Sequence, residues 1–131
     1  MSGTDIVAEI RSQYGREERQ AGELYGDVFA AFESAGFPAY VETRGGLAVC
    51  AIAPDGTRFV VASEAALPWD RDALDGWHLS HVAEDEPSTP WRCTVYDTVV
   101  ATLDYEEAID VANLVSAARA HLGVCPKSAM A

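Results

Sequence analysis

The sequence contains very little lysine and cysteine, and it lacks any long apolar run. Lys127 is the only lysine, and Cys50, Cys93 and Cys125 lie far apart with no CxxC pair. An odd number of scattered cysteines favours reduced thiols in an intracellular protein over a disulfide framework. The first residues lack the basic region and apolar core of a signal peptide, and no apolar run reaches the length of a membrane span. We therefore expect a cytoplasmic protein.

Basic charge is scarce as well. The chain has 21 acidic and 9 basic residues, a formal net charge of −12. Such a charge repels phosphate backbones and anionic lipid surfaces, so we expect no direct binding to nucleic acid or membranes. Most of the excess lies between Glu64 and Asp110, where Arg71 and Arg92 are the only basic residues. The preference for arginine over lysine and the frequent alanine suggest GC-rich codons, hence a bacterial or phage source.

Motifs for phosphate binding and nucleophilic catalysis are also missing. Gly45 and Gly46 lie in an expected hairpin with no lysine or helix start after them, and no GxSxG sequence is present. Carboxylates such as Asp75 are abundant, and a solvated acidic surface explains them more simply than a general acid and base. We expect no catalytic residues and no cofactor, and a non-enzymatic function.

A chain of 131 residues fits one domain. We assign residues 1–123 to that domain and expect residues 124–131 to form a flexible tail. Apolar residues at helical spacing predict a first helix from Thr4 to about Ala35, where Gly36 and Pro38 end it. Gly15 would permit a kink or break in this helix.

Three short strands follow in residues 39–44, 47–53 and 57–63, separated by turns at Gly45-Gly46 and Pro54-Asp55-Gly56. A two-residue turn at the glycines would pair Val41 with Cys50 and place both on one face with Ile52. The second and third strands carry apolar residues on both faces. We therefore expect the second face to be covered by a helix, a loop or a second subunit.

The second half begins with a proline-punctuated loop, residues 64–76, holding one short helix capped by Asp70. Residues 77–83 and 91–103 predict two more strands around a polar connector, with a bend in the second strand at Asp97. Asp104 and Glu107 resemble a capping box that begins a last helix ending near Gly123. The fold class is therefore α+β, in the order α-β-β-β-(short α)-β-β-α, with one antiparallel sheet and helices packed on one face.

Histidine and cysteine offer a possible metal site. His78 and His81 lie on one expected strand, but their odd spacing places them on opposite faces, and adding Cys93 gives no recognised spacing. His121 and Cys125 are four residues apart, but Gly123 interrupts the helix between them. We therefore predict no metal site.

The tryptophans suggest a protein interface instead. Trp69 and Trp91 border acidic segments, and aromatic residues rimmed by acid suit a basic, partly apolar protein partner. For Trp77 and Trp91 the alternative of a packing role is favoured, so Trp69 is the stronger interface candidate. The residues that we assign to a candidate partner interface are Trp69, Asp70, Asp72, Glu84, Asp85, Glu86 and Trp91.

The element order, size and acidity resemble the secretion-chaperone-like α+β domains, a class that includes type III secretion chaperones. The resemblance spans most of the chain. It implies a domain that forms homodimers and holds extended client segments on its sheet and helix surfaces.

Three functional hypotheses follow. The first is a non-enzymatic protein-interaction module, an adaptor or chaperone-like protein, acting as a homodimer. The second is an inhibitor that mimics nucleic acid and presents its carboxylates to the basic groove of a DNA-binding protein. The third is a small-ligand or metal-binding domain that uses His78, His81 or Cys93.

Overall fold

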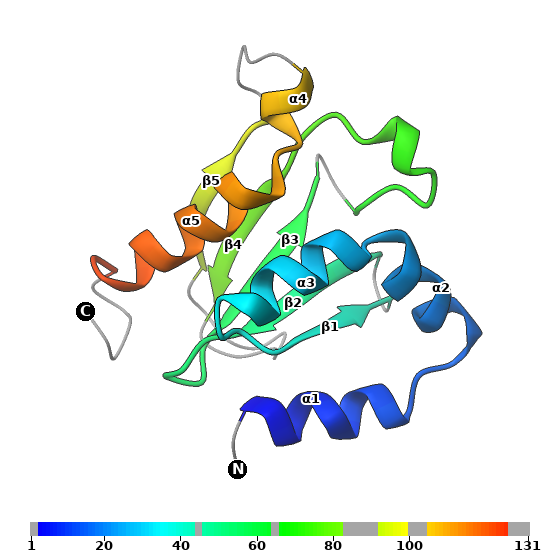
Figure 1. Cartoon of the computed structure of the whole chain (residues 1–131). Coiled ribbons are helices and arrows are strands. Elements are labelled where there is room, and N and C mark those ends of the chain that lie inside the picture. The colour runs from blue at the N-terminus through cyan, green and yellow to red at the C-terminus, as the bar shows by residue number, and fades with distance from the viewer. Residues whose placement is uncertain (1–2, 44–45, 64–65, 83–91, 100–104, 126–131) are drawn as a thin grey trace.

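A computed structural model of the chain describes residues 3–43, 46–63, 66–82, 92–99 and 105–125. Its centre is a five-stranded antiparallel sheet in which each strand pairs with its neighbour in the sequence. Figure 1 shows the sheet crossed by helices α3 and α5. The α+β class and the single antiparallel sheet are thus confirmed. The strands are β1 (Ala39–Glu42), β2 (Ala48–Ile52), β3 (Arg58–Ala62), β4 (His78–Val82) and β5 (Arg92–Asp97).

The expected first helix is divided into three. They are α1 (Gly3–Ser12), α2 (Arg16–Leu24) and α3 (Gly26–Ser34). The first break lies at Gly15, where the sequence permitted it, and the second lies at Tyr25, whose backbone leaves the helical region. The fully buried Tyr25 donates a 2.6 Å hydrogen bond from its hydroxyl to a carbonyl oxygen of the loop that follows β3, so tertiary contacts favour this second break.

The first hairpin differs in register from our prediction. Tyr40, not Val41, pairs with Cys50, and Val41 pairs with Val49. The expected shared face of Val41 and Cys50 is therefore wrong. The cause is the length of the turn, because residues 43–47 separate the paired ends and a two-residue turn is not formed. The second hairpin has a tight turn in which Gly56 takes a φ of +88°.

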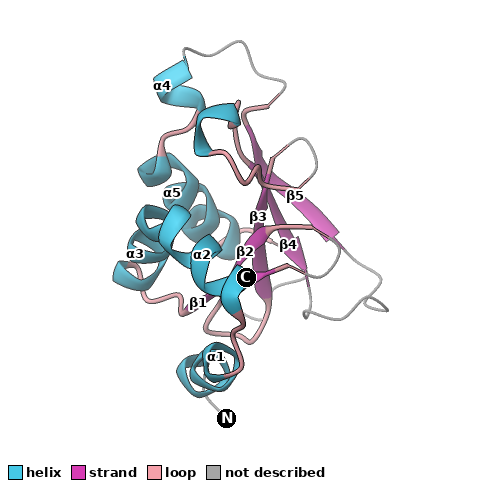
Figure 2. Ribbon diagram, turned by 90° about the vertical axis from the view of Figure 1, so that its right-hand side faces the viewer, coloured by secondary structure: helices cyan, strands magenta, loops and turns pink. Residues whose placement is uncertain are grey.

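Both faces of the sheet are covered where β1 and β2 lie. Helices α3 and α5 (Val111–Leu122) contact each other above a core that includes Val49, Val61 and Leu79. On the reverse face, Val7 of α1 packs with Tyr40, Cys50 and Ile52. Figure 2 shows α3 and α5 on one side of the sheet and α1 separate from them. A helix of the same chain thus provides cover that the sequence left open.

The second half follows the expected order with shorter elements. The loop after β3 holds a 3-10 turn, η1 (Arg71–Ala73), whose first residues are capped by the Asp70 carboxylate. The last helix is divided into α4 (Tyr105–Ala108) and α5, because Asp110 takes an extended conformation and caps α5 through the Asn113 N–H. The proposed cap at residue 104 lies outside the described residues. Among the helices described, none is long and apolar enough to cross a membrane.

Candidate metal centre

The first component of the site is His81 on β4. Its imidazole is fully buried and stacks on the ring of Phe59, 4.7 Å away between centroids. Phe59 belongs to the core beneath the helices, so His81 faces that layer. His78 lies three residues earlier on the strand and interacts instead with Asp97, with 3.3 Å between Nδ1 and Oδ2. The predicted placement of the two histidines on opposite faces is therefore confirmed.

The second component, Cys93, lies on the neighbouring strand. Residues His81 and Cys93 are direct partners in the β4–β5 register, and the side chains of directly opposed residues lie on the same face of a sheet. Cys93 is partly buried. Sheet pairing therefore places a thiol beside the buried imidazole, although the sequence spacing between the two gives no sign of it.

The last two components, His121 and Cys125, come from the end of α5. Gly123 ends this helix, as expected, but its φ of −75° and ψ of −15° keep the chain in a right-handed helical turn. The Cys125 N–H donates a 2.8 Å hydrogen bond to the His121 carbonyl oxygen, an α-helical pattern that continues past the glycine. The two side chains therefore stay on one face. Our inference that Gly123 separates them was wrong for this reason. Cys125 is 1% exposed, although we assigned it to the tail.

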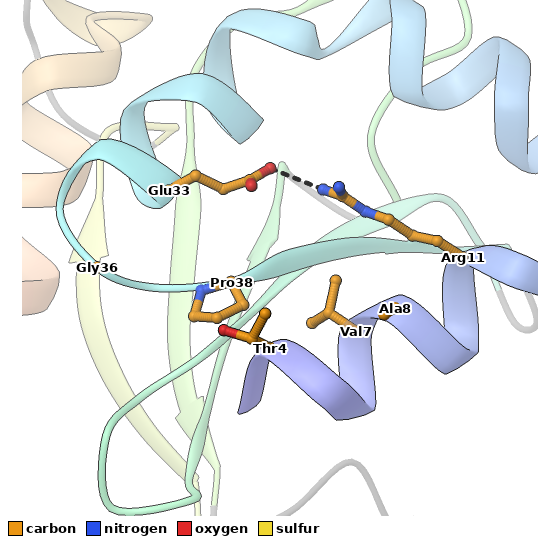
Figure 3. A pocket seen from close by; sticks show the side chains of 7 residues that line it. All are labelled: Thr4, Val7, Ala8, Arg11, Glu33, Gly36 and Pro38. Carbon is orange, nitrogen blue, oxygen red and sulfur yellow. Dashed lines mark hydrogen bonds and ion pairs between the residues drawn. The ribbon is translucent and has the colours of Figure 1, made fainter. Parts of the chain in front are cut away.

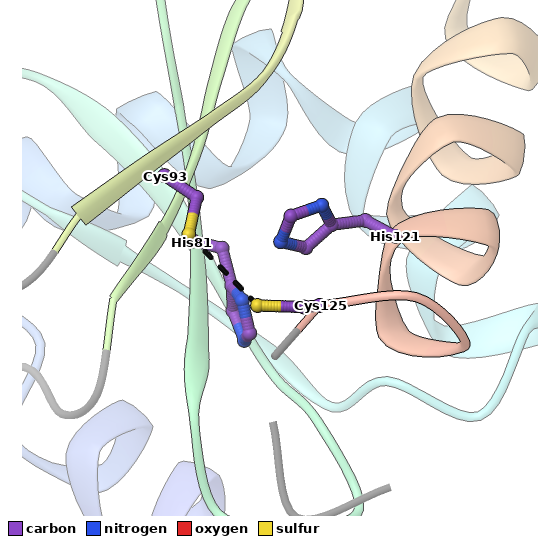
Figure 4. Close-up of side chains that lie close together, drawn as sticks. All are labelled: His81, Cys93, His121 and Cys125. Atoms are coloured by element: carbon purple, nitrogen blue, oxygen red, sulfur yellow. Dashed lines mark hydrogen bonds between the residues drawn. The ribbon is translucent and has the colours of Figure 1, made fainter. Parts of the chain in front are cut away.

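The four side chains converge in space, as Figure 4 shows. One ligand atom from each of His81, Cys93, His121 and Cys125 lies within 4.8 Å of all the others. The two sulfur atoms are 3.9 Å apart. In tetrahedral zinc sites, Zn–S bonds of about 2.3 Å and Zn–N bonds of about 2.0–2.1 Å place ligand atoms about 3.3–3.8 Å from one another. The sulfur pair already has about this spacing, and the widest pair must contract by about 1 Å.

Burial sets the charge state of the two imidazoles. It lowers the pKa of His81, and the nearby His121 lowers it further, whereas the Asp55 carboxylate raises it. Burial also lowers the pKa of His121. Both histidines are therefore neutral near pH 7, the form that binds a metal ion. The Nε2 atom of His121 is buried and forms no hydrogen bond with any residue that the structure describes.

Two thiols and two imidazoles form a ligand set with a clear preference. Sulfur and nitrogen ligands in tetrahedral geometry are typical of zinc, and sites with four protein ligands serve structure because no position stays open for a substrate. Two of the three histidines and two of the three cysteines in the chain meet at this point. The sequence signal that could have revealed the site is the His121-x-x-x-Cys125 spacing at a helix end.

The candidate interface residues that the structure describes are not part of this cluster. Trp69 is 49% exposed, and Asp70 and Asp72 are exposed beside it. Trp77 is fully buried, so its alternative role as a packing residue is confirmed. The remaining members of the predicted interface, Glu84, Asp85, Glu86 and Trp91, lie outside the described residues.

A cavity of about 280 Å³ lies between α1 and the segment that joins α3 to β1, as Figure 3 shows. Arg11 at its edge donates one hydrogen bond to Glu33 and one to the Ala39 carbonyl oxygen, each 2.7 Å long. Its cation is therefore already paired, and the rest of the lining is mostly small or apolar. The candidate metal ligands lie instead on β4, on β5 and at the end of α5.

Comparison of the chain with protein-family models, curated proteins and solved structures finds no match.

Proposed function

We propose that this chain is a zinc-binding domain in which a Cys2His2 site fastens the end of α5 to strands β4 and β5. The observation that carries the proposal is that four ligand atoms lie within 4.8 Å of one another. They come from β4, from β5 and from the C-terminal end of α5. The burial of His81 and Cys125 supports a structural role, and burial also lowers the pKa of both imidazoles and so favours their neutral, metal-binding form.

Metal analysis of the purified chain, after removal of any histidine tag, tests this proposal. We expect about one zinc ion per chain in the wild type, since the four ligands make one site. Cys125→Ser should reduce the bound zinc strongly. Cys50→Ala is the matched control, because Cys50 is another buried cysteine but packs against α1 on the reverse face. Zinc-free wild-type protein that also fails to take up added zinc would overturn the proposal.

Cobalt substitution tests the ligand set itself. Cobalt(II) in a tetrahedral site with two thiolates gives intense absorption from ligand field and thiolate charge transfer, which octahedral sites with oxygen ligands lack. We expect both sets of bands in the wild type and in Cys50→Ala. Cys93→Ser should lose part of the thiolate charge-transfer intensity. A wild-type spectrum typical of octahedral cobalt would contradict the assignment of the four ligands.

A second function is supported by Trp69. We propose that the turn from Trp69 to Asp72 binds a basic protein partner, which makes the domain an adaptor or chaperone-like module. A large aromatic side chain exposed beside two carboxylates suits an arginine-rich or lysine-rich surface. Tyr25 holds this turn in place through its hydrogen bond to the Pro68 carbonyl oxygen. The acidic surface is therefore presented in a fixed conformation.

Sedimentation of the purified chain tests the expected homodimer. The second function is tested by quantitative pull-down with wild-type and Trp69→Ala baits. We expect Trp69→Ala to lose specific basic proteins that the wild type retains. Val124→Ala is the matched control, because Val124 is the other large apolar residue exposed among the described residues. Identical recovery by both baits would contradict a role of Trp69 in binding.

A further inference from the structure

The turn between β2 and β3 lies beside the candidate metal centre and connects to it by hydrogen bonds. The Thr57 hydroxyl oxygen lies 2.7 Å from His81 Nε2 and 2.6 Å from Asp55 Oδ1. A continuous chain therefore leads from a carboxylate, through a hydroxyl group, to an imidazole that belongs to the site.

The chemistry of these groups fixes the direction of both hydrogen bonds. An ionised carboxylate only accepts, so the Thr57 hydroxyl donates its single proton to Asp55. The same oxygen must then accept from His81, which places the imidazole proton on Nε2. The lone pair of the neutral ring consequently lies on Nδ1. A ligating histidine needs this arrangement, with one nitrogen donating outward and the other available to the metal.

The turn itself is well fixed. The Thr57 N–H donates to Asp55 Oδ1 at 3.0 Å, and the Thr57 carbonyl oxygen accepts from Ala53 at 2.9 Å. Gly56 completes the turn with a positive φ. A residue with a side chain rarely adopts such a φ. The position of the Thr57 hydroxyl is therefore determined by the hairpin before any metal binds.

We propose that Thr57 is a positioning residue of the zinc site, which holds His81 in the Nε2–H tautomer and so directs Nδ1 to the metal. Asp55 acts behind it by orienting the hydroxyl and supplying negative charge, which makes the ring a stronger ligand. This inference rests on the proposed zinc site. It assigns the β2–β3 turn a part in metal affinity, although no residue of the turn is itself a ligand.

The test compares Thr57→Val with Thr57→Ser. Valine keeps the shape of threonine but has no hydroxyl group, whereas serine retains it. We expect zinc binding, measured by competition with a fluorescent chelator, to weaken about 10–100-fold in Thr57→Val and to remain within a few-fold of wild type in Thr57→Ser. Circular dichroism of the zinc-free proteins shows whether each variant is folded.

A second measurement reads the tautomer directly. In the zinc-free protein, ¹⁵N chemical shifts of the His81 ring should show a protonated Nε2 and a bare Nδ1. Thr57→Ser should keep this pattern, and Thr57→Val should show a mixture of tautomers. A purely structural role for Thr57 would lower stability without changing the tautomer.

The outcomes separate the two proposals. A wild type that binds no zinc overturns the proposed function. Zinc binding in the wild type, together with unchanged affinity in folded Thr57→Val, overturns only the role of Thr57. A wild-type His81 ring protonated on Nδ1 also overturns that role, because the lone pair would then lie on the wrong nitrogen.

Discussion

At the scale of single residues, Gly76 shows how closely the backbone segments pack at one end of the sheet. A Cβ atom added there would lie 2.8 Å from the Thr98 hydroxyl oxygen and 2.9 Å from main-chain atoms of Thr98 and Val99. That hydroxyl is fixed, because it accepts from the Trp77 N–H and donates to the Ala108 carbonyl oxygen. The contact therefore cannot be relieved by rotating a flexible side chain.

We predict that Gly76→Ala lowers the free energy of unfolding by about 1–3 kcal/mol, the usual cost of overpacking. Gly22→Ala is the matched control, because Gly22 lies inside α2 and a Cβ atom there meets nothing within 4 Å. That variant should be more stable by up to about 1 kcal/mol, since alanine favours helix. Urea unfolding at fixed zinc concentration measures both. Equal stability of the two variants would contradict the prediction.

The two histidines of the site give a dependence of stability on pH in the zinc-free protein. Because the pKa values of His81 and His121 are lowered in the folded state, the unfolded chain takes up protons first as the pH falls. The free energy of unfolding should be unaffected by these groups well above pH 6.5 and should decrease below about pH 6.5. Once the pH is below the folded pKa values, the two groups cause no further loss.

Urea unfolding in the presence of a chelator, between pH 7.5 and 5.5, measures this effect. We predict that His121→Gln loses less stability than the wild type over this range, because one of the two proton-binding groups is removed. A steeper loss in the variant would show that His121 is not held neutral by burial.

At the scale of elements, one arginine joins the loop after β3 to the helices. Arg71 forms a two-pronged ion pair with Asp27, with distances of 2.8 and 2.9 Å, and also donates to the Leu24 carbonyl oxygen. Its guanidinium lies over the rings of Tyr25 and Trp77. The hydrogen bonds that Arg71 donates to the Asp27 carboxylate are the main reason why the pKa of Asp27 is lowered.

We predict that Arg71→Lys costs about 1 kcal/mol, because an ammonium group cannot reproduce the planar fork, and the half-exposed Asp27 limits the loss. Arg16→Lys, in the exposed first turn of α2, should have almost no effect. Thermal unfolding of both variants measures the difference. A comparable loss in Arg16→Lys would indicate a general effect of replacing arginine.

The elements also show what the sequence could reveal. Short apolar runs separated by clear turn residues predicted the three-stranded meander and the α+β class. The predicted register of the first hairpin was wrong, because Gly45 and Gly46 do not by themselves set the turn length. The break at Tyr25 was missed because its cause is a contact with Pro68, far away in the sequence. The convergence of the four candidate ligands was not predicted for a similar reason, since sheet pairing and helix docking bring these residues together.

At the scale of the whole molecule, bound zinc should stabilise the fold. A ligand that binds only the folded state at 100 times its Kd adds about 2.7 kcal/mol, which for a domain of this size raises Tm by on the order of 10 °C. We predict such a shift in the wild type and in Cys50→Ala on adding zinc, and none in Cys125→Ser. Differential scanning calorimetry measures it. A zinc-induced shift that persists in Cys125→Ser would place the metal elsewhere.

The order of the strands has a consequence for synthesis. Each strand pairs with its neighbour in the sequence, so the sheet can form hairpin by hairpin as the chain leaves the ribosome. Helix α5 must then dock against α3, which was made much earlier, and it carries His121 and Cys125 with it. The nascent chain can therefore fold its sheet without metal, and the proposed zinc site is complete only after residue 125 has emerged.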